Sequence, residues 1–388
     1  MITLRGVTWD HPRAVDSIRS ASDAFHAANP DVVVEWVARP LHEFEDVPIE
    51  ELAGSFDLLA LDHPFMGDAA EHRALMPLND LIPAPELGAR AEAYVGQSYE
   101  SYTWNGLQLA LPVDAACMVS AFRPDRIDHT TLPKKWSDAA DFIRNLDSGR
   151  TLMAANPTHL WCTFLTLCEA VSGASSTTSS TGPVWWTEGG IDEAIFAPAI
   201  DLLRGLLAVS SPLSLHSDPI AVLNLLASDG DFDYCPLVFE YSTYSLERDG
   251  FGLIEFANGP SGDDPTSGPL TGGVGLAVSA LSAEPLWAAR FAMYATSNEI
   301  QAGLYSRAGG QPAARAAWQD PEVNKHAHAM YYNTAASMDT AFLRPRGRNF
   351  PAFQRAAAAA LHAMTIEGQS GANICRELNR MWVERAIV

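Results

Sequence analysis

The sequence predicts an α/β protein built of two domains. Its 388 residues suffice for two domains of ordinary size, each with its own hydrophobic core. Strand-like and helix-like apolar patterns alternate along residues 2–61, which is typical of an open parallel sheet flanked by helices. A short, nearly uncharged stretch at 112–116 lies between two apolar runs and suits a chain that crosses from one domain to another.

The first domain begins with three predicted strands. Strands are expected at Ile2–Val7, Asp31–Val37 and Phe56–Leu61. A helix is expected at Ala14–Ala28, after the first of these strands. Two similar loops, Trp9–Pro12 and Asp62–Phe65, follow strands, and each places an aromatic residue, Asp and His around a Pro. Ligands of open parallel sheets gather at the carboxyl ends of strands, so these loops are the first candidate site.

The centre of the chain is the stretch Trp104–Asp125. It opens with a tight turn at Asn105-Gly106, where Gly supplies a positive φ. The apolar runs Leu107–Pro112 and Met118–Phe122 follow, and the second ends at an Arg-Pro-Asp turn. We therefore expect two strands here, with the crossing between the domains in the middle.

The second half of the chain continues the α/β pattern. Helices are expected at Leu160–Ser172, Ile191–Leu207 and Pro285–Tyr294, strands at Asp231–Tyr241 and Gly272–Val278, and a return crossing at Phe256–Pro269. The remainder of the chain is predicted to be helical, with a strong helix-forming Ala run at 356–360.

Composition excludes several classes of function. The formal net charge of −22 is spread along the chain, whereas nucleic acids and anionic lipids need clustered Lys and Arg. The five cysteines are widely spaced and form no CxxC or Cys/His ligand pattern, so we expect buried thiols and no metal site. No phosphate-loop, dinucleotide, GxSxG or HExxH motif occurs, and no cofactor is expected.

Several segments resemble, in order, those of the family 1 extracellular solute-binding proteins of ABC importers (the maltose-binding-protein type). The similar segments, which span roughly residues 2–320, are Met76–Ile82, Asn105–Asp125, Leu132–Asp138, Gly272–Val278, Ser297–Gln301 and Gly309–Arg315. Two departures occur in the central segment: Ala110 stands where the family has Gly, and Ala121-Phe122-Arg123 replaces Tyr-Asn.

The resemblance implies a type II periplasmic-binding-protein-like fold, in which two lobes, each a mostly parallel sheet flanked by helices, enclose a ligand cleft. It implies an N-terminal lobe of 1–112 plus 257–314 and a C-terminal lobe of 113–256 plus 315–388. The implied function is capture of a small polar organic ligand, above all a carbohydrate, by hinge closure. The implied partner is an ABC permease, and we expect a monomer and no catalysis.

The candidate ligand residues combine flat aromatic faces with groups that bind hydroxyls. They are Trp9, Asp10, His11, Asp62, His63, Phe65, Asp114, Trp161, Glu240, Tyr241, Gly273 and Arg307. An aromatic set of this kind could also hold a quaternary ammonium group. Structural roles stay open for several candidates, because Asp10 and Asp62 could cap helices, Trp161 could belong to the core and Arg307 could form a surface ion pair.

Two alternatives remain open at this stage. A cytoplasmic enzyme or sensor could share the fold; in an enzyme resembling thiaminase I, Cys117 would be the nucleophile and Glu240 the base. The chain enters a strand pattern directly at Met1, without a basic segment and apolar stretch of signal-peptide length. We therefore expect a periplasmic or extracytoplasmic protein if a signal peptide was removed, and a cytoplasmic one if Met1 is the native start.

Overall fold

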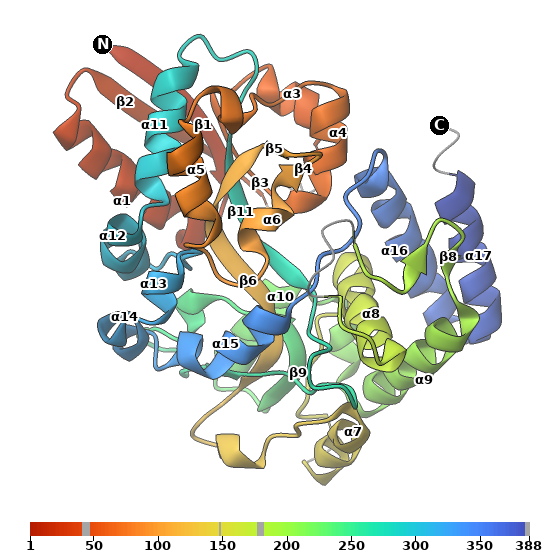
Figure 1. The fold of residues 1–388 in the computed structure, drawn as a ribbon. Helices are drawn as coiled ribbons and strands as arrows, with labels where there is room; N and C mark the ends of the chain where they lie inside the picture. The colour runs from red at the N-terminus through yellow and green to blue at the C-terminus, as the bar shows by residue number, and fades with distance from the viewer. Residues whose placement is uncertain (41–46, 147–148, 177–181, 385–388) are drawn as a thin grey trace.

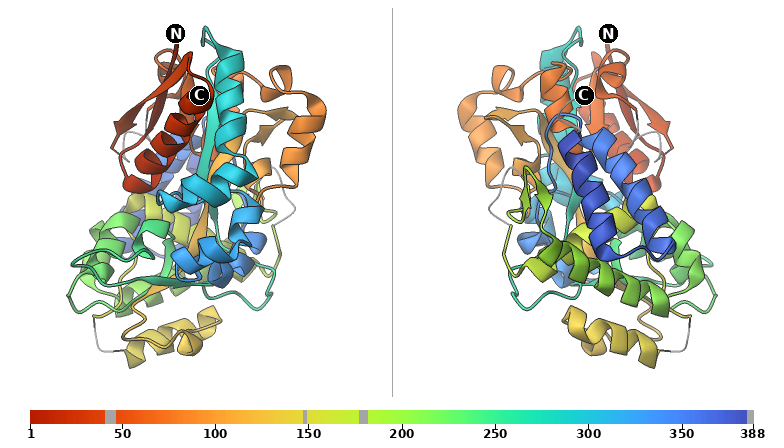
Figure 2. Two further views of the ribbon diagram at one scale, coloured as in Figure 1. Left: turned by 90° about the vertical axis from the view of Figure 1, so that its left-hand side faces the viewer. Right: turned by 90° about the vertical axis from the view of Figure 1, so that its right-hand side faces the viewer.

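The computed structural model describes residues 1–40, 47–146, 149–176 and 182–384. It has two α/β lobes, one at the upper left of Figure 1 and one at the lower right. The views in Figure 2 show the same two lobes from two further sides, one lobe above the other. The predicted α/β fold with two lobes is confirmed.

The first lobe is organised around a sheet with the strand order β2-β1-β3-β11-β6. Its strands are β1 (Ile2–Trp9), β2 (Val32–Arg39), β3 (Leu58–Leu61), β11 (Thr271–Val278) and the first half of β6 (Ala110–Phe122). β1 pairs in parallel with both β2 and β3, and β11 alone runs in the opposite direction. This lobe therefore has the mostly parallel sheet that the sequence predicts.

Helices cover both faces of this sheet, because its strands are apolar on both sides. On one face, α1 (Pro12–Ala28) and α11 (Pro285–Ala295) pack Ile18, Phe25 and Phe291 against Leu4 and Leu276. On the other face, α3 (Ile49–Ala53) and α4 (Met66–Glu71) bury a second cluster around Leu59 and Phe65. The carboxyl ends of β1 and β3 point towards the other lobe (Figure 1).

The strand β6 connects the two lobes without a break. Residues 110–117 pair with β11 in the first lobe, and residues 118–122 pair with β9 (Tyr234–Phe239) and β10 (Glu255–Ala257) in the second. The sequence places two separate strands here with a crossing between them. All thirteen residues of β6 are instead buried in one strand, so the crossing is made by extended backbone rather than by a loop.

The sheet of the second lobe is arranged around β6, which runs opposite to both of its neighbours. Both β9 and β10 run antiparallel to β6, and a parallel bridge joins Thr151 to Tyr234 beside β9. The strands beside β6 therefore share one direction and β6 alone runs opposite to them, as β11 does in the first lobe. The reason is geometric: β6 enters from the first lobe, and the strands on both of its sides lead the chain back towards that lobe.

Four helices form the aromatic core of the second lobe: α8 (Pro157–Ser172), α9 (Glu193–Val209), α16 (Phe350–Ile366) and α17 (Gly371–Glu384). Phe164, Phe196 and Trp382 lie in this core, and α16 and α17 lie side by side in Figures 1 and 2. All five cysteines lie in the described part of the chain, are buried and form no disulfide.

Two buried glutamines fasten the segment at 311–314 to β6. The Gln311 side chain donates to the Ala115 carbonyl oxygen at 2.8 Å and accepts from the Ser242 N–H at 3.1 Å. The Gln301 side chain donates to the Val113 carbonyl oxygen at 3.0 Å and accepts from the Ala313 N–H at 2.7 Å. These bonds satisfy buried backbone groups at the junction of the lobes.

The remaining elements are short or peripheral. They are α5 (Ala84–Ala91), α6 (Ser98–Ser101), β4 (Thr103–Trp104), β5 (Leu107–Gln108), α7 (Trp136–Asn145), β7 (Trp186–Thr187), β8 (Gly190–Ile191), α10 (Pro219–Ala227), α12 (Asn298–Ile300), α13 (Arg315–Trp318), α14 (Pro321–His326) and α15 (Met330–Thr340). The predicted turn joins β4 to β5, with positive φ angles of 49° at Asn105 and 79° at Gly106. No helix among the described residues is long and apolar enough to cross a bilayer.

Candidate functional site

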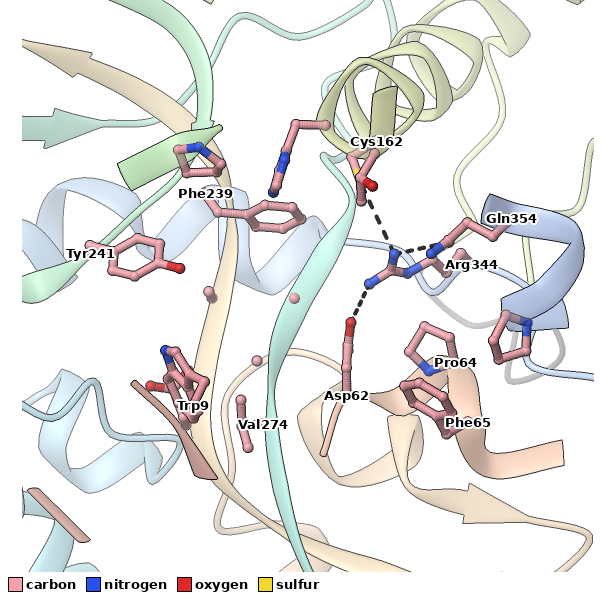
Figure 3. Close-up of a pocket in the computed structure, with 18 of the residues that line it drawn as sticks. Trp9, Asp62, Pro64, Phe65, Cys162, Phe239, Tyr241, Val274, Arg344 and Gln354 are labelled. Atoms are coloured by element: carbon pink, nitrogen blue, oxygen red, sulfur yellow. Dashed lines mark hydrogen bonds and ion pairs between the residues drawn. The ribbon is translucent and has the colours of Figure 1, made fainter. Parts of the chain in front are cut away.

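A cavity of about 120 Å³ lies between the lobes, at the carboxyl ends of β1 and β3. The first lobe contributes aromatic and acidic side chains, and the second lobe contributes Phe239, Tyr241 and residues of α8 and α16 (Figure 3). The lining comprises Trp9, Arg13, Asp62, Pro64, Phe65, Asp114, Ala116, Thr158, His159, Cys162, Pro219, Phe239, Tyr241, Gly272, Gly273, Val274, Arg344, Pro351, Gln354 and Arg355.

The structure brings six of the twelve candidate residues together in this lining. They are Trp9, Asp62, Phe65, Asp114, Tyr241 and Gly273. They come from five separate strands or the loops that follow them, so the site is assembled by the fold rather than by one motif. Asp62 also has the structural role that the sequence left open, because its side chain accepts from the His63 N–H at 2.7 Å and caps a short 3₁₀ helix.

Three further candidates lie behind the lining. The His11 ring meets the Tyr241 ring edge to face at 5.0 Å. Burial, and to a lesser extent the positive charge of Arg13, lowers the His11 pKa to about 4. His63 Nδ1 lies 2.9 Å from Asp62 Oδ1, and burial lowers the His63 pKa to about 4 despite that carboxylate. Glu240 is fully buried, and its role is described with Cys117 below.

The other three candidates lie away from the cavity. Asp10 and Arg307 are exposed. Trp161 lies in the aromatic core of the second lobe, where its ring is 5.8 Å from that of Trp186 and 5.9 Å from that of Phe164. The helix α8 turns Trp161 towards the core and His159 towards the cavity, and the spacing of apolar residues alone does not decide between these two faces.

A buried ion pair between Arg13 and Asp114 forms one wall of the cavity. Arg13 Nε donates to Asp114 Oδ2 at 2.7 Å, and Nη2 donates to Oδ1 of the same carboxylate. Burial lowers the Arg13 pKa, but the attraction of Asp114 outweighs burial and raises it overall. The same guanidinium donates to the Glu240 carbonyl oxygen at 2.7 Å and lies 4.5 Å from the centre of the Tyr241 ring, so it links the two lobes.

A second guanidinium, that of Arg344, links the lobes on the opposite side of the cavity (Figure 3). Arg344 Nη2 donates to Asp62 Oδ2 at 2.8 Å, and Nη1 donates to Gln354 Oε1 at 3.0 Å. Burial alone would raise the Asp62 pKa, but Arg344 and His63 outweigh burial and lower it to about 2. Asp62 is therefore ionised at neutral pH and pairs with Arg344 across the cavity.

Arg344 belongs to a segment, 344–349, that is bonded along its length to the first lobe. Arg346 Nη1 donates to the carbonyl oxygens of Glu100 and Ser101, both at 2.6 Å. The Asn349 N–H donates to Asp68 Oδ1 at 2.7 Å. This segment leads into α16 and therefore joins a helix of the second lobe to the surface of the first.

Sequence reasoning missed Arg13, His159, Arg344 and Gln354. Arg13 follows the first candidate loop by one residue, so a wider window would have included it. Three arginines at 344, 346 and 348 are unusual in a chain with so few basic residues, and this cluster was a usable signal. No local pattern marks His159 or Gln354, because each lies on a helix whose orientation depends on the packing of the whole lobe.

Gly273 lines the cavity and has a backbone conformation that favours glycine. Its φ is +124°, and a Cβ atom there would lie 2.5 Å from the Asp114 carbonyl oxygen. We expect Gly273→Ala to lower the free energy of unfolding by roughly 1–3 kcal/mol, measured by urea denaturation. Gly88→Ala in α5 is the matched control, because no atom lies within 4 Å of that Cβ and we expect a gain of about 0.5–1 kcal/mol. Equal effects of the two substitutions would contradict this explanation.

Cys117 and Glu240 are adjacent, but they are not arranged for nucleophilic catalysis. Both Glu240 carboxylate oxygens lie 3.2 Å from the Cys117 backbone nitrogen, which donates to them. The Cys117 thiol is fully buried. This burial, and to a lesser extent the charge of Glu240, raises the thiol pKa well above its usual value. A nucleophile needs an accessible thiolate, and neither residue lines the cavity, so the thiaminase-like alternative lacks its geometry.

Within the described ranges, no group of three or more His, Cys, Asp or Glu side chains could hold a metal ion. The polar groups of the cavity include carboxylates, guanidinium groups, hydroxyls, an imidazole and an amide, which suit hydrogen bonds to a polar organic molecule.

No protein-family model and no curated protein matches the sequence. Solved structures do match. They include T. maritima MalE3 with bound maltose, with a TM-score of 0.80 and 17% identity over 98% of this chain and 99% of that one. UgpB from Mycobacterium tuberculosis, in complex with glycerophosphocholine, has a TM-score of 0.79 and 17% identity over 100% of both chains.

An ABC transporter solute-binding protein from Agrobacterium vitis S4 with bound D-mannitol has a TM-score of 0.74 and 16% identity over 100% of this chain and 98% of that one. At these identities the likeness establishes the fold. The chain has the two-lobed fold of the maltose-binding-protein type, as the sequence resemblance implies.

Proposed function

We propose that this protein is a solute-binding protein of an ABC importer that captures a small polar organic ligand, with carbohydrates and polyols as the leading class. The observation that carries the proposal is the cavity, to which both lobes contribute aromatic faces and hydrogen-bonding groups. Proteins of the same fold have been solved with maltose, D-mannitol, tagatose and glycerophosphocholine. Each of these ligands is small and carries at least two hydroxyl groups.

The lining suits such ligands chemically. Trp9, Phe65 and Tyr241 offer flat apolar surfaces for the C–H faces of a sugar or polyol. Carboxylate oxygens of Asp62 and Asp114 can accept hydrogen bonds from hydroxyl groups in addition to those from their arginine partners. We propose that these five residues contact the ligand.

We propose that ligand binding works by closure of the two lobes about the segments near 112, 257 and 314. A ligand that contacts both lobes favours the closed state by the difference in its affinity for the two states. The proposed rigid bodies are 1–112 with 257–314, and 113–256 with 315–388. The segment 344–349 is bonded to the first lobe, so we expect it to follow that lobe or to release Asp62 on opening.

The proposal implies a membrane partner and a location. A closed, ligand-bound solute-binding protein is recognised by an ABC permease, so we propose such a permease as the protein partner. The protein would then act as a monomer outside the cytoplasmic membrane. An enzyme or a cytoplasmic sensor on the same fold is the competing function, and the fate of the ligand distinguishes an enzyme from a binding protein.

Thermal unfolding in the presence of maltose, D-mannitol, D-tagatose and glycerophosphocholine tests the proposal. A ligand at about a hundredfold its Kd adds about 2.7 kcal/mol to the free energy of unfolding, which raises Tm by a few degrees. We expect at least one hydroxyl-rich compound to do so and to be recovered unchanged. Trp9→Phe is expected to weaken its binding about tenfold, because part of the aromatic face is lost.

Arg307→Ala is the control for that substitution. Arg307 is exposed and does not line the cavity, so its loss should leave the Kd unchanged. No shift with any compound would refute this ligand class, and chemical conversion of a bound compound would favour the enzyme. Equal weakening by Trp9→Phe and Arg307→Ala would place the ligand outside the cavity.

A further inference from the structure

His159 occupies a distinctive position in the wall of the cavity. It lies in the first turn of α8, only 6% of its surface is exposed, and its ring meets the Phe239 ring edge to face at 6.3 Å. Asn156, the residue that caps α8, is its hydrogen-bond partner. The ring is thus held by the helix cap on one side and by an aromatic neighbour on the other.

The hydrogen bonds at Asn156 fix the tautomer of this ring. Asn156 Oδ1 accepts from the His159 backbone N–H at 3.0 Å and lies 2.8 Å from His159 Nδ1. A backbone N–H can only donate, so the Asn156 atom facing it must be the oxygen rather than the nitrogen of the amide. An amide oxygen can only accept, so Nδ1 must carry the proton and Nε2 must carry the lone pair.

His159 Nε2 has no hydrogen-bond partner within the part of the chain that the structure describes. The ring is also neutral, because burial and the nearby Arg344 lower its pKa to about 3. The imidazole therefore presents an acceptor to the cavity and cannot donate from that nitrogen at neutral pH.

The two buried arginines of the lining are already engaged with carboxylates. Arg13 pairs with Asp114, and Arg344 pairs with Asp62. The Arg344 bond to Gln354 Oε1 also orients that amide so that its NH₂ group faces away from the guanidinium. The carboxylates and the imidazole are therefore acceptors available to a ligand, while the two guanidinium charges are neutralised by their partners.

We propose that His159 Nε2 accepts a hydrogen bond from one hydroxyl group of the ligand and thereby selects for a donor at that position. This inference rests on the proposed function and adds to it a specificity-determining residue. A buried acceptor left without a donor costs free energy, so an analogue with hydrogen, fluorine or a carbonyl group in place of that hydroxyl is rejected. We expect the rejection to be about tenfold to a hundredfold in Kd.

Two measurements test the inference. Long-range ¹H–¹⁵N NMR of the ligand-free protein at neutral pH should show the His159 ring as the Nδ1–H tautomer, assigned by comparison with His159→Gln. Calorimetry should then use whichever of maltose, D-mannitol or D-tagatose binds, together with its monodeoxy and deoxyfluoro analogues. His159→Leu should weaken binding at least tenfold, and His159→Gln, which keeps an acceptor, should recover part of the loss.

The decisive result is a coupling between the residue and one hydroxyl. The analogue lacking that hydroxyl should bind the wild type at least tenfold more weakly than the parent compound, but should bind His159→Leu about as well as the parent does. An Nε2–H tautomer, or binding with no such coupling at any hydroxyl, would overturn the His159 proposal and leave the proposed function intact. Failure of all three compounds to bind would overturn both.

Discussion

Asp114→Ala is expected to lower the free energy of unfolding by about 3–5 kcal/mol, because it leaves a buried guanidinium without its counter-ion. Arg13 is 4% exposed and Asp114 is 1% exposed, so water cannot replace the lost carboxylate. The remaining partners of Arg13 are the Glu240 carbonyl oxygen and the face of Tyr241, neither of which carries a full negative charge at neutral pH. Urea denaturation followed by tryptophan fluorescence would measure the loss.

Two variants separate the buried pair from a general effect of removing an aspartate. Asp339→Ala removes the partner of Arg315 from an exposed pair with an N–O distance of 3.2 Å, and we expect a loss below about 1 kcal/mol. The double variant Arg13→Met/Asp114→Leu should recover most of the loss seen in Asp114→Ala, since neither charge is then buried. Similar losses for Asp114→Ala and Asp339→Ala would contradict a buried ion pair.

Much of the fold could be predicted because its signals are local. The pattern of β1, α1, β2 and β3 lies in consecutive short segments, and the Asn-Gly turn between β4 and β5 is set by two residues. The directions of β9 and β10 relative to β6 could not be predicted in this way. They depend on pairing between residues more than a hundred positions apart, such as Met118 with Phe239.

The same distinction between local and long-range information applies to the candidate site. Trp9, Asp62 and Phe65 were predicted to lie together because they follow strands of one parallel sheet, a rule that needs only the strand order. Arg13 and Arg344 were missed because arginines of an acidic chain are expected on its surface. Their burial depends on carboxylates 101 and 282 positions away, and only the tertiary structure brings those together.

Glu240→Gln is expected to change how stability depends on pH. Burial raises the pKa of Glu240 to about 8, whereas that of an unfolded glutamate is about 4.5. Between these values the unfolded chain loses the proton that the folded protein retains, so the free energy of unfolding falls by about 1.4 kcal/mol per pH unit as pH rises. Glutamine keeps the shape and an acceptor for the Cys117 N–H but cannot ionise.

The comparison is clearest between pH 6.5 and 8. His11, His63 and His159 have lowered pKa values of about 4, 4 and 3, so their stabilising contributions grow as pH rises towards 6.5 and oppose that of Glu240 below it. Above pH 6.5 these contributions level off, and they are the same in both proteins, so Glu240→Gln should gain about 2 kcal/mol on the wild type between pH 6.5 and pH 8. The exposed Glu322→Gln should leave the wild-type slope unchanged. Parallel pH profiles for Glu240→Gln and the wild type would mean that Glu240 is ionised in the folded protein throughout this range.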